Sequence, residues 1–193
     1  MPNPYRVLTE GSVVALVDWP SADVPRTLVR AGFDVYSLNR LRETAASYAW
    51  YPSREQVPEG DDTTVFEPAE EGDGYLVCHP AVTPATVDIL NVYRPADELP
   101  GLARLAVQLG AKALWLQPGS TSPEARDIAE AGGLAFIEDA DIADAVRSAG
   151  MPLRQPTRTP SDVPRQARRR QRHRSPRSGR GPNSVGTGRR SPG

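Results

Sequence analysis

The sequence has very few of the residues on which several classes of site depend. It contains one cysteine, Cys78, and two histidines, which excludes a disulfide within the chain and a metal site built from several cysteines. No apolar run approaches the roughly 18 residues that a transmembrane helix requires. Residues 1–12 lack the basic start and the apolar stretch of a signal peptide. We therefore expect a cytoplasmic protein.

The motifs of common catalytic sites are also missing. The sequence has no G-x-S-x-G elbow, no P-loop, no H-E-x-x-H pair and no G-x-G-x-x-G turn. His79 follows Cys78 directly, but neighbours on a strand point to opposite faces, so a structural role is favoured for this histidine. His173 lies in a polar, arginine-rich segment and is not expected to be catalytic. The sequence therefore favours a binding protein over an enzyme.

Charge divides the chain into two parts. Residues 151–193 hold 12 arginines against one acid, Asp162, a formal charge of +11, whereas 11 basic and 23 acidic residues precede them, a formal charge of −12. The C-terminal part has no apolar periodicity, so it cannot bury enough surface to offset the entropy of ordering. We expect a folded domain over residues 5–150 and a disordered tail over residues 151–193.

Two interpretations of the arginine-rich tail stay open. The tail could hold RNA, DNA, another polyanion or an acidic protein partner by charge. It could equally be a solvated segment that rests against the acidic part of its own chain. The tail contains no aromatic residue on which bases could stack, so the solvated interpretation is favoured.

The first 150 residues repeat one local plan, in which a helical pattern ends at a glycine and a short apolar strand follows. The glycines are Gly32, Gly110 and Gly132, where a left-handed residue would end each helix. The strands that follow, and two further apolar runs, are residues 35–38, 113–116, 134–137, 13–17 and 88–93. Strands that alternate with helices over short loops predict an α/β domain with a doubly wound parallel sheet.

Smaller features complete this prediction. Asp23 and Ser122 are expected to cap helices, and residues 64–66 and 75–79 are expected to form a hairpin. The acidic residues between 59 and 73 could form a loose calcium or magnesium site. Their spacing fits no known loop, so a solvated acidic loop is favoured and no metal is expected.

Ligands of doubly wound folds bind at the carboxyl ends of the strands, so the residues that follow each predicted strand are candidates. Arg40 and Arg94 could hold phosphates near a helix N-terminus, although each alone could be an ordinary exposed arginine. Trp19 could stack on an adenine or could plug the site. The candidates at these positions are Asp18, Trp19, Pro20, Ser21, Asn39, Arg40, Arg94, Pro95, Gln117 and Gly119.

A family resemblance is visible in "NVYRPADELPGLARLAVQLGAKALWLQPGSTSPEARDIAEAGGLAFIEDADI". An aromatic–Arg–Pro triplet, a helix, "GAKALWLQ-G" and "A--AGL" resemble the second half of the small bacterial CoA-binding proteins. "AGFDVYSLNR" resembles the second strand of that family, and "WYPSREQVP" resembles its next loop. The likeness covers roughly residues 5–58 and 85–142.

These proteins are single Rossmann-like domains, similar to the CoA-binding domain of the succinyl-CoA synthetase alpha subunit. The resemblance implies that these candidates, together with Tyr93 at the end of residues 88–93, line a cleft for coenzyme A (CoA). It also implies binding without turnover, because the synthetase works through a phosphohistidine in a second domain that has no match here. The implied function is non-catalytic or regulatory binding of CoA or an acyl-CoA.

Three departures from the family pattern bear on that function. The family has a Gly-Ala-Ser type of loop where this chain has Val17, Asp18 and Trp19, and Asp18 places a negative charge toward a polyanion. Residues 59–84 look like an insertion, and the later basic residues and cysteine of the family have no match after Asp139. The alternative is a degenerate module that has lost nucleotide binding and acts in protein or nucleic-acid interaction through its basic tail.

Overall fold

The computed structural model describes residues 3–38, 45–60 and 62–151. Its helices are α1 (Pro4–Glu10), α2 (Asp23–Arg30), the 3-10 turn η1 (Arg54–Gln56), α3 (Leu99–Gln108), α4 (Pro123–Ala131) and α5 (Ile142–Ser148). Its strands are β1 (Val13–Val17), β2 (Asp34–Leu38), β3 (Ala45–Tyr51), β4 (Thr64–Phe66), β5 (Tyr75–Ala81), β6 (Ile89–Val92), β7 (Ala113–Leu116) and β8 (Ala135–Ile137). The tail predicted over residues 151–193 lies outside the described residues from 152 onward, so the domain boundaries stay a prediction.

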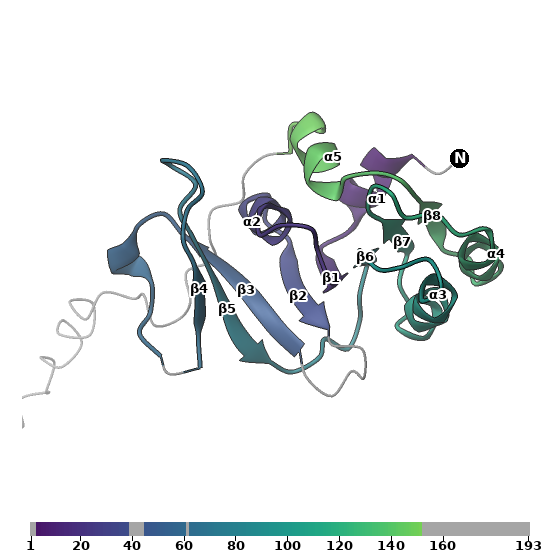
Figure 1. Cartoon of the computed structure of the whole chain (residues 1–193), viewed down its shortest axis with the longest axis horizontal. Coiled ribbons are helices and arrows are strands. Elements are labelled where there is room, and N and C mark those ends of the chain that lie inside the picture. Colours follow the sequence, from purple (N-terminus) through teal and green to yellow (C-terminus); the bar gives the residue numbers. More distant parts are fainter. Residues whose placement is uncertain (1–2, 39–44, 61, 152–193) are drawn as a thin grey trace, which may run out of the picture. The chain divides into compact units, whose positions relative to one another are not determined.

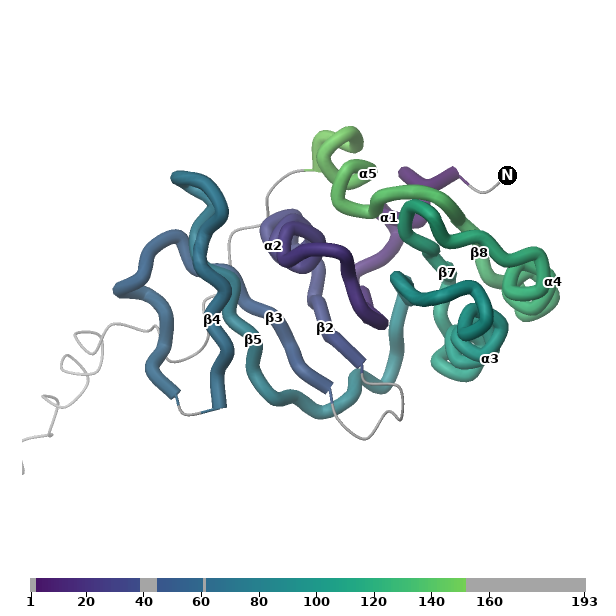
Figure 2. Tube along the Cα trace, viewed as in Figure 1, coloured from purple at the N-terminus to yellow at the C-terminus, as the bar shows by residue number. Residues whose placement is uncertain are grey.

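The strands form one sheet in the order β4-β5-β3-β2-β1-β6-β7-β8. The pairings from β2 through β1, β6 and β7 to β8 are parallel, whereas β3 pairs antiparallel with β2 and β5, and β4 antiparallel with β5. The α/β prediction is therefore confirmed, with an antiparallel extension on one side. The predicted hairpin is also confirmed, and Figure 2 traces it beside β3.

Two apolar clusters cover the two faces of the sheet. One joins alternate strand residues such as Leu90 and Leu114 to α3 and α4, and the other joins their neighbours, such as Ile89 and Trp115, to α1, α2 and α5. Figure 1 shows α2 and α5 together on one side of the sheet, and α3 beside α4. Continuous apolar runs such as β6 and β7 are buried on both faces, which is why their sequences do not alternate.

The predicted helix ends are partly right. Ser122 caps α4 and accepts a hydrogen bond from the backbone N–H of Ala125, as expected. Asp23 does not cap α2: Ala22 holds the cap position without a side-chain bond, and the Asp23 carboxylate pairs with Arg147 of α5 instead. The left-handed conformation was expected at Gly32, Gly110 and Gly132, and the structure has it at the first two.

Gly132 is needed for a different reason. Its backbone is right-handed at φ −80°, and Gly133 takes the left-handed conformation instead. A Cβ on Gly132 would lie 2.4 Å from Cγ2 of Val107 on α3. Gly132 therefore lets the end of α4 approach α3 closely, which the sequence pattern did not reveal.

The hairpin of β4 and β5 is fixed to α2 by arginines. Arg26 is 4 % exposed and donates from Nη2 to the carbonyl oxygen of Glu67 at 2.8 Å. One turn further along α2, Arg30 lies over the Trp50 ring and pairs with Asp73 at 3.9 Å. Trp50 in turn donates to the carbonyl oxygen of Asp73 at 2.6 Å. The acidic connection between β4 and β5 is therefore attached to the rest of the domain at Glu67 and at Asp73. It is not a wholly solvated loop.

Asp88 fixes the amino ends of β1 and β6. Its Oδ2 accepts from the backbone N–H groups of Ser12 and Val13 at 2.8 and 2.9 Å, and its Oδ1 pairs with Lys112 at 2.7 Å. Burial works against the charged form, but these contacts outweigh it and hold the pKa of Asp88 well below its usual range.

No helix among the described residues is long and apolar enough to cross a membrane.

We expect Asp88→Asn to lower the free energy of unfolding at pH 7 by about 1–3 kcal/mol, since the carboxylate is only 17 % exposed and its bonds are charge-assisted. A carboxyl whose pKa is lowered by folding stabilises above its unfolded pKa, near 4, and loses that effect as the pH falls through the folded value. Urea unfolding at pH 7 and pH 3 should therefore show a smaller difference at pH 3. Asp127→Asn, an exposed carboxylate on α4, is the control, and an equal difference at both pH values would contradict the prediction.

Candidate functional site

The candidate site lies at the switch point of the sheet, where the strand order reverses between β1 and β6. From β1 the chain passes through α2 to β2 on one side, whereas β6, α3 and β7 extend the sheet on the other side. The carboxyl ends of β1 and β6 are therefore left without a crossover between them, and open α/β sheets bind ligands at such a point. Val17 is paired with Val92 in the parallel register, so the residues that follow these two strands meet.

Asp18 and Arg94 form an ion pair across this point. Oδ2 of Asp18 lies 2.6 Å from Nη1 of Arg94. Arg94 also donates to Glu98 from Nε at 3.0 Å and from Nη2 at 2.7 Å, a spacing of one helical turn. The bonds to Glu98 and then to Asp18 raise the pKa of Arg94, which keeps its charge fixed. Arg94, which the sequence analysis named as a phosphate-binding candidate, therefore already pairs with two carboxylates.

Asp18 has an uncommon backbone conformation. Its φ of 63° lies in the left-handed region, which aspartate tolerates better than most residues with a side chain. Asp139, which follows β8, has φ 53° and accepts from the backbone N–H of Gly119 at 2.8 Å. Each aspartate thus joins its own strand end to the loop after the neighbouring strand.

The other predicted residues of the first loop divide between solvent and core. Pro20 and Ser21 are exposed, and the Ser21 carbonyl accepts from the N–H of Val24 at the start of α2. Trp19 is half-buried and meets Tyr48 of β3 edge-on, with ring centroids 5.6 Å apart. It also packs on the apolar cluster beneath α2 and α5. One flank of Trp19 is therefore used in the fold.

Four of the remaining predicted residues lie after β6 and β7. Tyr93 and Pro95 are exposed on either side of Arg94 after β6. Gly119 is exposed after β7 with φ 80°, whereas Gln117 is completely buried. Asn39 and Arg40 lie outside the described residues. The structure thus brings Asp18 and Arg94 into contact. That the candidate residues contact a ligand stays a prediction.

Gln117 contacts a residue that the sequence analysis did not single out. Its Nε2 donates to Oδ1 of Asn91 on β6 at 2.9 Å, and both side chains are fully buried. Within the described part of the chain, Nδ2 of Asn91 and Oε1 of Gln117 have no hydrogen-bond partner. The only sequence signal for Asn91 is an amide inside the apolar run "DILNVY". Glu98 was also missed, although its spacing of four residues from Arg94 is the spacing of helical ion pairs.

The geometry at Cys78 does not favour a nucleophile. Cys78 lies opposite Tyr48, and His79 lies opposite Ser47, so the thiol and the imidazole are on opposite faces of β5. Burial raises the pKa of the Cys78 thiol, and burial also raises the pKa of Tyr48 above its usual range. The protonated forms therefore dominate at neutral pH. In the described residues, no group of three or more His, Cys, Asp or Glu side chains is placed to hold a metal ion.

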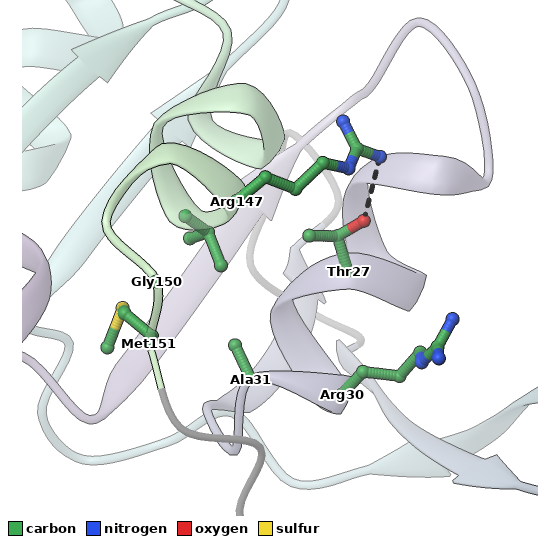
Figure 3. A pocket seen from close by; sticks show the side chains of 7 residues that line it. Thr27, Arg30, Ala31, Arg147, Gly150 and Met151 are labelled. Carbon is green, nitrogen blue, oxygen red and sulfur yellow. Dashed lines mark hydrogen bonds between the residues drawn. The ribbon is translucent and has the colours of Figure 1, made fainter.

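A separate hollow of about 260 Å³ lies between the C-terminal ends of α2 and α5. Figure 3 shows Arg147 and Thr27 joined across it, with Ala31 and Met151 on its lining. Arg147 also pairs with Asp23 and Asp144, and Arg30 pairs with Asp73. Carbonyl-rich helix ends disfavour an anion, and both arginines are already paired, so this hollow does not compete with the strand ends as a phosphate site.

Comparison with known proteins shows the family and the fold. A family model described as "CoA binding domain" matches residues 13–156, and the chain belongs to this family. A solved structure from Thermus thermophilus, "cell-free ID.343", is 20 % identical, with a TM-score of 0.50 over 77 % of this chain and 99 % of that one. Prb, described as "PH1109 protein redesigned for binding", is 14 % identical, with a TM-score of 0.52 over 77 % and 91 %. At these identities the solved structures show a shared fold.

The buried amide pair makes a prediction about stability. Gln117→Leu alone should lower the free energy of unfolding by about 1–3 kcal/mol, because it leaves the Asn91 amide buried without its partner. Asn91→Leu should have a similar effect for the converse reason. The double variant removes both amides, so its loss should be smaller than the two single losses added together. Urea unfolding of the four proteins measures this difference, and strictly additive losses would contradict the prediction.

Proposed function

We propose that this chain binds CoA or an acyl-CoA at the carboxyl ends of β1, β6 and β7, as a binding or regulatory protein of the cytoplasm and not as an enzyme. The observation that carries this proposal is the position of Arg94. Its side chain is 17 % exposed, it follows β6 directly, and it lies at the switch point beside the loop that leads into α2. Membership of the CoA-binding domain family supports the choice of ligand.

The chemistry of the site fits binding better than turnover. The cation at the switch point can hold an anionic group by charge-assisted hydrogen bonds. Backbone N–H groups in the first turn of α2 add a favourable dipole for an anion. Among the described residues, Cys78 and His79 lie on opposite faces of β5 and do not form a nucleophile–base pair. We therefore expect acyl-CoA to bind without being consumed.

The full 193-residue chain should bind CoA in isothermal titration, and Arg94→Ala should weaken that binding at least about tenfold. The variant loses the cation but keeps the negative charges of Asp18 and Glu98, which repel phosphate. Acetyl-CoA and NAD serve as comparison ligands, and an assay for free CoA tests turnover of the acetyl compound.

Arg104→Ala is the matched control for that titration. Arg104 pairs with Glu124 on the exposed surface of α3 and α4, so its loss changes the net charge without touching the strand ends. Both variants keep the arginines beyond residue 151, so a loss of CoA binding confined to Arg94→Ala would show that those arginines do not hold CoA by charge alone. Equal CoA affinity for the parent chain and Arg94→Ala would place the ligand elsewhere.

A degenerate module without a nucleotide is the alternative. The observations in its favour are the occupied guanidinium of Arg94 and the charge of +11 beyond residue 150. In that case CoA, acetyl-CoA and NAD would all give no heat. Binding of a single-stranded RNA would then be measured at low and high salt, with Arg168, Arg169 and Arg170 changed to Gln as the test variant. Retained RNA binding in that variant would count against the tail as the interaction site.

A further inference from the structure

The carboxylate of Asp18 accepts a hydrogen bond from Nη1 of Arg94, a donor that an anionic ligand would otherwise use. Arg94 uses Nη1 for Asp18, and it uses Nε and Nη2 for Glu98. All three guanidinium nitrogens therefore donate to carboxylates in the protein without ligand. These bonds use three of the five N–H groups of the guanidinium, and an incoming phosphate meets a cation whose charge is already shared by two carboxylates.

The two carboxylates are not equally easy to displace. Glu98 makes two hydrogen bonds, lies one helical turn from Arg94, and is 27 % exposed. Within the described part of the chain Asp18 makes one side-chain hydrogen bond, to Arg94; it follows a different strand, β1, and is 55 % exposed. A bidentate, better shielded pair is the stronger of the two. Asp18 is therefore the carboxylate that a ligand would displace.

The backbone explains why the Asp18 side chain is in that place. Asp18 directly follows the last residue of β1, and Val17 is in register with Val92 of β6. The backbone N–H of Tyr93 donates to the carbonyl oxygen of Val17 at 3.1 Å, which extends the pairing to the residue before Arg94. The left-handed φ of 63° then turns the chain at Asp18 itself, a conformation that glycine adopts without strain.

We propose that Asp18 is a specificity-determining residue: a tethered anion that competes with the diphosphate of the ligand for Arg94. This inference rests on the proposed function, because it assumes that CoA binds at these strand ends. It predicts that the parent chain binds CoA more weakly than the same chain without the Asp18 carboxylate. It also predicts that the pantetheine arm, which carries no diphosphate, is bound without this competition.

The test compares Asp18→Gly and Asp18→Asn with the parent chain in isothermal titration of CoA and of pantetheine. Removing the carboxylate should raise the CoA affinity on the order of tenfold or more, since a unit charge about 5 Å from a phosphate is repelled to that degree at an intermediate dielectric. Pantetheine affinity should stay within about twofold. Asparagine keeps the shape and tolerates the left-handed backbone, so it separates charge from conformation.

Asp97→Asn is the matched control, because Asp97 is exposed beside Glu98 and has the same charge. Tighter CoA binding by both Asp18 variants, and not by Asp97→Asn, would support the inference. Unchanged or weaker CoA binding by the Asp18 variants would overturn it while leaving the proposed function in place. If neither the parent chain nor any variant binds CoA, both the proposed function and this inference fail.

Discussion

The parallel pairing of β1 with β6 is the contact on which the rest of the structure depends. It joins the strand that begins the α2 half of the sheet to the strand that begins the α3 half. Asp88 holds its amino end through Ser12 and Val13, and Asp18 holds its carboxyl end through Arg94. One aspartate thus stabilises the register, and the other occupies the cation that the same register supplies.

The antiparallel extension adds a second constraint on the candidate site. Tyr48 of β3 supports Trp19 from below the first loop, and Arg26 ties α2 to the backbone of the hairpin at Glu67. The loop over residues 18–22 is therefore held from three directions: by Arg94, by Tyr48 and by the start of α2.

Sequence patterns predicted the elements whose chemistry is local. The apolar runs of β1 and β7 and the Ser-Pro start of α4 each carry their signal within a few residues. α1 and α5 were not predicted because each is seven residues long, too short for a helical period to stand out. β3 was not predicted because "AASYAWY" mixes small and aromatic residues, and its alternation is visible only once α2 is known to cover one face.

The positions of two candidate residues at strand ends were predicted, but the contact between them was not. Asp18 and Arg94 were both expected at strand ends, but their direct contact depends on the register of β1 against β6 and on a positive φ at Asp18. Neither property has a signature in the sequence. The same holds for Asn91 and Gln117, which meet because β6 and β7 are neighbours, and for Gly132, whose role is set by Val107 on another helix.

The pairing of β1 with β6 also bears on how the chain is made. Asp18 and Arg94 are 76 positions apart, and the strands that come between β1 and β6 in the sequence all lie on the β2 side of β1. During synthesis, the apolar edge of β1 therefore has no partner on its other side until residues 89–92 have left the ribosome. A nascent chain that stops earlier exposes an unpaired strand edge of the kind that promotes association between chains. Asp18 is synthesised before Arg94, so its negative charge lies beside that edge before the arginine is available to pair with it.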